Sequence, residues 1–100
     1  MGKEQIVNIL RREFAYLRSN YGVRRIALFG SFASDMAKDG SDIDLVIEFE
    51  RPLGFRFFEL SDYLEKVLGR KVDILTPDAV TGIRVPSVAQ SIKGTMFYVS

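Results

Sequence analysis

Two aspartates, Asp42 and Asp44, stand two positions apart in a largely apolar run that ends at Phe49. Side chains on a β-strand alternate between its faces, so a strand here would place both carboxylates on one face, about 7 Å apart. Asp73 lies in a second short apolar run and can join them if the two strands pair. At a separation of about 5 Å and an effective dielectric constant of about 20, each pair of carboxylates repels by roughly 3 kcal/mol. A bound divalent cation is the natural relief of this repulsion.

The residue types present restrict which cation this can be. The chain contains no cysteine and no histidine, so thiolate and imidazole ligands are excluded and the usual general base is missing. A site built from carboxylate oxygens favours Mg²⁺, with Mn²⁺ as the alternative, and such ions also accept substrate phosphates as ligands. Two such ions can stabilise the attacking and leaving oxygens of a phosphoryl-type displacement. The three aspartates therefore predict metal-assisted phosphate chemistry.

A second feature suited to phosphates is the pair Gly30-Ser31, where a run of β-forming residues gives way to a sequence compatible with a helix. Glycine lets the backbone approach a phosphate closely, while a serine hydroxyl and N–H groups at a helix start can donate hydrogen bonds to it. Ten residues separate Ser31 from Asp42, which leaves room for a short helix and a turn. Alone, each of these features has an ordinary explanation as a turn, a cap or a paired surface charge. In this order they favour a nucleotide and metal site.

The elements that position these residues follow from hydrophobic periodicity and turn signals. The predicted helices span residues 4–20, 31–37 and 55–68, and the predicted strands span residues 23–29, 42–49 and 71–76. The tail is weaker, with a short helix after Pro86 and an extended segment at 96–99. The chain is expected to form one domain over residues 1–100.

Alternation along the strand at 42–49 also predicts the core. The face opposite the aspartates carries Ile43, Leu45, Ile47 and Phe49. In the helix at 55–68, Phe58 and Tyr63 are expected to face the core, whereas Phe55 and Phe57 are better placed to contact a partner.

The overall composition gives no argument for nucleic acid or membrane binding. Fourteen basic and thirteen acidic residues leave a net charge of +1, which does not favour a polyanionic partner. The sequence shows no signal peptide and no apolar stretch of membrane-spanning length, so a cytoplasmic protein is expected.

Gly30-Ser31, the ten intervening residues, Asp42-Ile43-Asp44 and the later Asp73 together resemble the motif of the polymerase-β-type nucleotidyltransferase superfamily. Over essentially its full length the chain resembles the minimal nucleotidyltransferases of bacteria and archaea. This resemblance implies an α+β fold with a small mixed, largely antiparallel sheet flanked by helices. It also implies that Asp42, Asp44 and Asp73 hold two Mg²⁺ ions and that ATP binds near Gly30-Ser31.

The same resemblance implies a biological role and a partner. Similar proteins work as antitoxins beside a toxin RNase of the HEPN type and transfer AMP from ATP to a toxin tyrosine. In such a reaction Asp42 and Asp44 would hold one ion, Asp44 and Asp73 the second, and Asp73 would accept the proton of the attacking hydroxyl. The alternative is a non-catalytic antitoxin that masks its partner and retains a vestigial nucleotide site. A homodimer and a hetero-oligomer with the partner are both compatible with the sequence.

One departure from the family pattern keeps that alternative open. Family members often continue after Gly-Ser-Phe-Ala with Arg-Gly, whereas this chain has Ser34-Asp35. A positive charge expected near the triphosphate is therefore missing. The candidates to replace it are Lys38, Arg24, Arg25 and Arg84.

Overall fold

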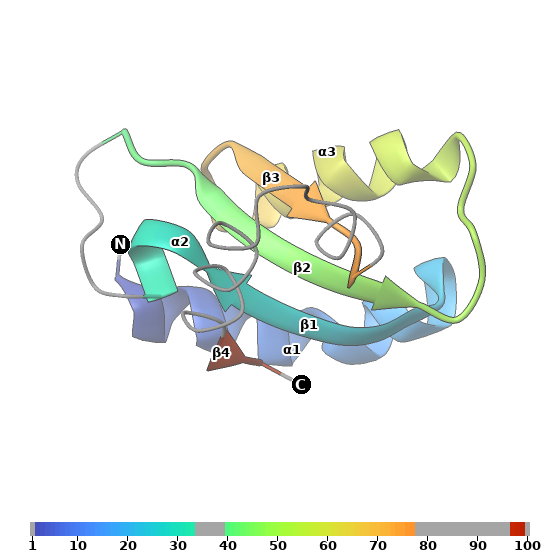
Figure 1. The fold of residues 1–100 in the computed structure, drawn as a ribbon, viewed down its shortest axis with the longest axis horizontal. Helices are drawn as coiled ribbons and strands as arrows, with labels where there is room; N and C mark the ends of the chain where they lie inside the picture. Colours follow the sequence, from blue (N-terminus) through green and yellow to red (C-terminus); the bar gives the residue numbers. More distant parts are fainter. Residues whose placement is uncertain (1, 34–39, 78–96, 100) are drawn as a thin grey trace.

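The chain alternates helices and strands around one four-stranded sheet (Figure 1). The computed structural model describes residues 2–33, 40–77 and 97–99. Its elements are α1 (Lys3–Tyr21), β1 (Val23–Phe29), α2 (Gly30–Ala33), β2 (Ile43–Phe49), α3 (Arg56–Leu68), β3 (Val72–Leu75) and β4 (Phe97–Tyr98). The second half of the predicted 31–37 helix and the helix predicted after Pro86 lie outside the described residues.

The strand that carries Asp44 is an inner strand of the sheet. The strand order is β3-β2-β1-β4. β1 pairs antiparallel with both β2 and β4, whereas β2 and β3 run parallel. The predicted mixed, largely antiparallel sheet is therefore confirmed. Asp44 lies opposite Phe29 of β1 on one side and opposite Asp73 of β3 on the other.

Two helices cover one face of this sheet, and the main core lies between them and the strands. α1 and α3 lie on the same side of the sheet (Figure 1). Ile43, Leu45 and Ile47 are fully buried there, as predicted, and Phe49 packs against the same cluster. Each such buried aliphatic side chain contributes about 1.5–3 kcal/mol. The apolar face of β2 thus anchors the strand and leaves the aspartates on the opposite face.

Glycines follow the two long helices, which end within one residue of the predicted positions 20 and 68. Gly22 after α1 and Gly69 after α3 have φ angles of 64° and 70°, in the left-handed region. The Gly69 N–H donates a hydrogen bond to the Glu65 carbonyl, which satisfies one of the last carbonyls of the helix. No helix within the described ranges is long and apolar enough to cross a membrane.

The prediction for Phe58 was wrong. Its side chain is 69% exposed, because the buried stripe of α3 runs through Leu60, Leu64 and Leu68. Two residues along a helix turn the side-chain direction by roughly 200°, so Phe58 points away from the stripe set by Leu60. Tyr63 does pack against the core, as predicted. Phe55, expected to be available to a partner, is 92% exposed.

Tyr63 also ties α3 to α1 by a hydrogen bond, which predicts a pH dependence of stability. Its hydroxyl donates to Glu13 Oε1, and this bond raises the pKa of Tyr63 from 10.0 to about 12. Because the pKa is higher in the folded state, this contribution is complete below pH 10 and is lost as the pH rises toward 12. We expect the thermal midpoint of the natural chain to fall more steeply over this range than that of Tyr63→Phe. Equal slopes would contradict the assignment.

Candidate functional site

Three carboxylates gather on the face of the sheet that α1 and α3 do not cover. Asp42 stands one residue before β2, Asp44 lies within it, and Asp73 lies on β3 directly opposite Asp44. Asp42 and Asp44 are half-buried, whereas Asp73 is exposed. Parallel pairing of β2 with β3 therefore brings the three predicted site residues onto neighbouring positions.

The electrostatics of Asp44 reflect this crowding. Burial raises the pKa of the Asp44 carboxyl above its ordinary value of 3.8, and the charges of Asp73 and then Asp42 raise it further. A raised pKa means that the ionised form of Asp44 is disfavoured in the folded protein. A cation bound here would reverse that balance, because it stabilises the charged form.

Gly30 lies against Asp44. The strand β1 ends at Phe29, and Gly30 turns the chain into α2 with φ 73°, in the left-handed region. A Cβ atom at this position would clash with Oδ2 of Asp44 and lie 3.2 Å from its Cγ. Only glycine meets both the backbone angle and the close approach. Gly30 of the predicted phosphate pair thus lies against Asp44, one of the predicted metal ligands.

Comparison with known proteins identifies the family of the chain. A family model of the nucleotidyltransferase domain matches residues 5–96. The chain belongs to this family. The family and the enzyme class predicted from the sequence are therefore confirmed, and Asp42, Asp44 and Asp73 are the candidate catalytic residues of a nucleotidyltransferase.

Relatives of nearly the same length carry a more specific description. The protein adenylyltransferase MntA of Thermococcus cleftensis is 35% identical over 97 residues, which cover 96% of this chain and 94% of MntA. A protein of Methanocaldococcus jannaschii described as a candidate protein adenylyltransferase is 47% identical over 77 residues, 76% of this chain and 90% of the relative.

Solved structures agree on the fold. The structure of a candidate minimal nucleotidyltransferase superposes with a TM-score of 0.71 at 28% identity, covering 97% of this chain and 95% of that chain. A chain from the complex of tri-AMPylated Shewanella oneidensis HEPN toxin with its MNT antitoxin gives a TM-score of 0.63 at 20% identity, covering 98% of this chain and 71% of that chain. At that identity the second likeness concerns the fold alone.

The donor set of the nucleotidyltransferase site suits Mg²⁺ in its chemistry. It consists of carboxylate oxygens on or next to two neighbouring strands, and the pKa of the Asp44 carboxyl is raised by burial and by the charges of Asp73 and Asp42. Within the described ranges, no three acidic side chains already converge as a complete ligand set. Asp73 is exposed and can change rotamer. The metal-binding role of the three aspartates therefore stays a prediction, in which a shift of side chains accompanies ion binding.

The structure describes two of the four cations proposed to replace the missing family arginine. Ser34-Asp35, Lys38 and Arg84 lie outside the described residues. Arg24 lies 3.8 Å from Glu48, and the Arg25 guanidinium lies 5.4 Å from the centre of the Tyr98 ring. Both arginines stand near the start of β1, whereas Gly30 follows its end.

Arg70 is a residue near the site that the sequence did not single out. Its guanidinium lies 5.5 Å from the centre of the Phe32 ring in α2, and its Nη1 donates to the Ser41 carbonyl at 3.4 Å. Phe32 follows Ser31, and Ser41 precedes Asp42. Arg70 thus links the segment after the phosphate pair to the segment before the carboxylates. Nothing in the local sequence signals contacts over such separations.

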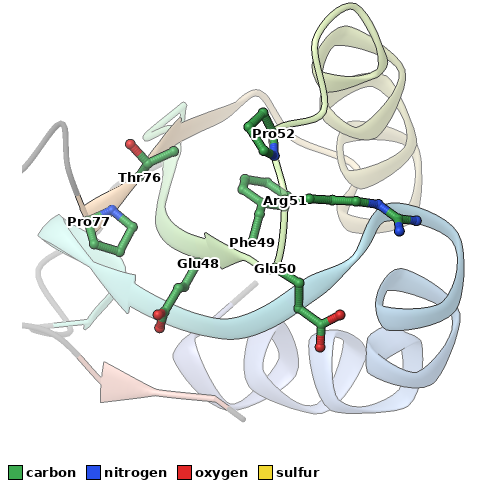
Figure 2. A pocket seen from close by; sticks show the side chains of 7 residues that line it. All are labelled: Glu48, Phe49, Glu50, Arg51, Pro52, Thr76 and Pro77. Carbon is green, nitrogen blue, oxygen red and sulfur yellow. The ribbon is translucent and has the colours of Figure 1, made fainter.

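A hollow of about 430 Å³ lies apart from the carboxylates, at the carboxyl ends of β2 and β3 (Figure 2). Its lining residues are Glu48, Phe49, Glu50, Arg51, Pro52, Thr76 and Pro77. Phe49 pairs with Val23 at the start of β1, whereas Gly30 follows the end of that strand. The hollow and the phosphate pair therefore lie at opposite ends of the sheet.

Proposed function

We propose that this nucleotidyltransferase is a protein adenylyltransferase that moves AMP from ATP to a hydroxyl of a partner protein. We further propose that the acceptor is a tyrosine of a HEPN-type toxin, so that the chain acts as a cytoplasmic antitoxin. The observation that carries the proposal is the placement of Asp44 opposite Asp73 and against Gly30. The relatives described as protein adenylyltransferases support the choice of a protein acceptor.

The proposed reaction is a single displacement at the α-phosphorus of ATP. The acceptor oxygen forms a bond to the α-phosphorus, the bond from that phosphorus to the oxygen bridging to the β-phosphate breaks, and pyrophosphate leaves. Asp73 accepts the proton of the hydroxyl. Gly30-Ser31 binds the departing phosphates, and Asp42, Asp44 and Asp73 would hold Mg²⁺, which neutralises phosphate charge when bound. Catalysis by positioning and charge neutralisation needs no histidine.

A nucleotide site of this kind should stabilise the protein when it is filled. ATP with Mg²⁺ at about 100 times its dissociation constant adds roughly 2.7 kcal/mol of stability. For a domain of this size the thermal midpoint should then rise by on the order of 10 °C. The control is ATP with a chelator, which should give little of this shift. Absence of any shift at millimolar ATP would contradict a working nucleotide site.

The alternative is an antitoxin that masks its partner without modifying it. Ser34-Asp35, in place of the family's Arg-Gly, is the feature that favours this possibility. Masking should survive the removal of a single carboxylate at Asp42 or Asp44, whereas modification should not. Toxin neutralisation by these variants therefore separates the two functions.

A further inference from the structure

The hollow at the ends of β2 and β3 has an acidic side. Figure 2 shows the side chains of Glu48 and Glu50 extending to one side and Arg51 extending away from them. Glu48 lies 3.8 Å from Arg24, so its charge is partly balanced. Glu50 is exposed and takes part in no ion pair within the described part of the chain. Glu50 therefore provides the charge that a ligand in the hollow would meet.

The hollow lies within reach of the carboxylates. Glu48 shares a strand face with Asp44 and stands four residues further along β2, which corresponds to about 13 Å. Thr76 follows Asp73 by three residues, about 10 Å. Ligands of open α/β sheets commonly bind outside the carboxyl ends of parallel strands, and here β2 and β3 are the parallel pair.

The direction of the proposed reaction points to the occupant. In an in-line displacement the attacking oxygen and the leaving pyrophosphate lie on opposite sides of the α-phosphorus. The pyrophosphate belongs to the side of Gly30-Ser31, next to Asp44. The acceptor then approaches from the other side, where Asp73 stands on β3 and the chain continues into Thr76 and Pro77 at the hollow.

We propose that this hollow receives a segment of the acceptor protein, with a lysine or arginine of that segment facing Glu50. The proposal rests on the proposed function and names how the acceptor is recognised. A volume of about 430 Å³ lies within the range of sites that enclose a small ligand or a few side chains. Glu50 stands six residues beyond Asp44, so the basic side chain and the acceptor hydroxyl should lie about 20 Å apart, which about six extended residues span.

Reversing the charge of Glu50 tests this docking site. Glu50→Lys should raise the KM for the HEPN-domain partner by roughly tenfold or more, because a like charge then faces the basic side chain. The KM for ATP should stay within about twofold, which a general structural defect would not allow. The matched control is Glu4→Lys, which makes the same change at an exposed position in the first turn of α1 and should leave both constants unchanged. An unchanged KM for the partner in Glu50→Lys would overturn the inference.

Two synthetic acceptors test the charge requirement directly. Each is a glycine–serine peptide with one tyrosine and, six positions away, either a lysine or a glutamate. The natural chain should modify the lysine peptide with the lower KM, and Glu50→Lys should reverse the preference. Equal KM values, or modification of the partner but of neither peptide, would overturn the inference while the proposed function stands. Absence of transfer to the partner itself would instead overturn the proposed function.

Discussion

Asp44→Asn is expected to lose AMP transfer by about a thousandfold and yet to unfold at a higher temperature than the natural chain when metal and nucleotide are absent. The loss follows from removing a group that fixes charge at the reacting phosphate, a type of change that costs about 10²–10³-fold in rate. The gain follows from removing a charge that burial disfavours and that Asp73 and Asp42 repel.

The sign of the stability change follows from the pKa. The stability that a carboxyl with a raised folded-state pKa contributes is complete below the ordinary value of 3.8 and is lost as the pH rises through the folded value. At neutral pH the ionised Asp44 therefore weighs against folding. We therefore expect the midpoint of Asp44→Asn to rise, and each 1 kcal/mol gained corresponds to about 4–8 °C in a domain of this size.

The measurements for Asp44→Asn are a transfer rate and two melting curves, with and without Mg²⁺ and ATP. Asp62→Asn is the matched control, because Asp62 is an exposed carboxylate on α3. It should transfer AMP normally and show no gain in midpoint. Transfer by Asp44→Asn at the natural rate would remove Asp44 from the catalytic set. Neutralisation of the toxin without transfer would favour masking.

The sequence predicted the elements well where glycines flank an apolar run. β1 begins and ends at the predicted residues, because Gly22 and Gly30 flank it and both have positive φ angles. The alternation along residues 42–49 placed the two aspartates and the buried residues on the correct faces, because successive side chains of a β-strand point to opposite faces. These local signals were sufficient to place the candidate site residues on one face of the sheet and the core residues on the other.

Features that depend on long-range contacts were not predictable in this way. The prediction for Phe58 was wrong because the direction of its side chain relative to the leucine stripe of α3 decides its burial, and its hydrophobicity does not. Arg70 reaches Ser41 across 29 positions, and only the folded chain brings the two together. The parallel pairing that sets Asp73 beside Asp44 was stated from the sequence only as a condition, because short strands do not specify their neighbours.

Gly30→Ala is expected to disable the site through the contact with Asp44. An alanine with φ near the 73° found here costs roughly 1–2 kcal/mol in backbone energy. Its Cβ would also clash with Oδ2 of Asp44, so that carboxylate must move. Displacing a reacting or positioning group by about 1 Å can cost about 10²-fold in rate. We therefore expect both a lower stability and a loss of transfer of at least about 10²-fold.

Gly69→Ala separates the two effects of this substitution. Gly69 has φ 70°, almost the same backbone strain, but a Cβ there meets no atom within 4 Å. In urea unfolding Gly69→Ala should lose the stability that the backbone strain costs and Gly30→Ala at least as much, whereas only Gly30→Ala should lose transfer when rates are corrected for the folded fraction. Equal transfer by the two variants would mean that the place of Asp44 against Gly30 is a packing feature without a role in the reaction. Selective loss in Gly30→Ala would show that glycine is required because a catalytic carboxylate occupies the space of its missing side chain.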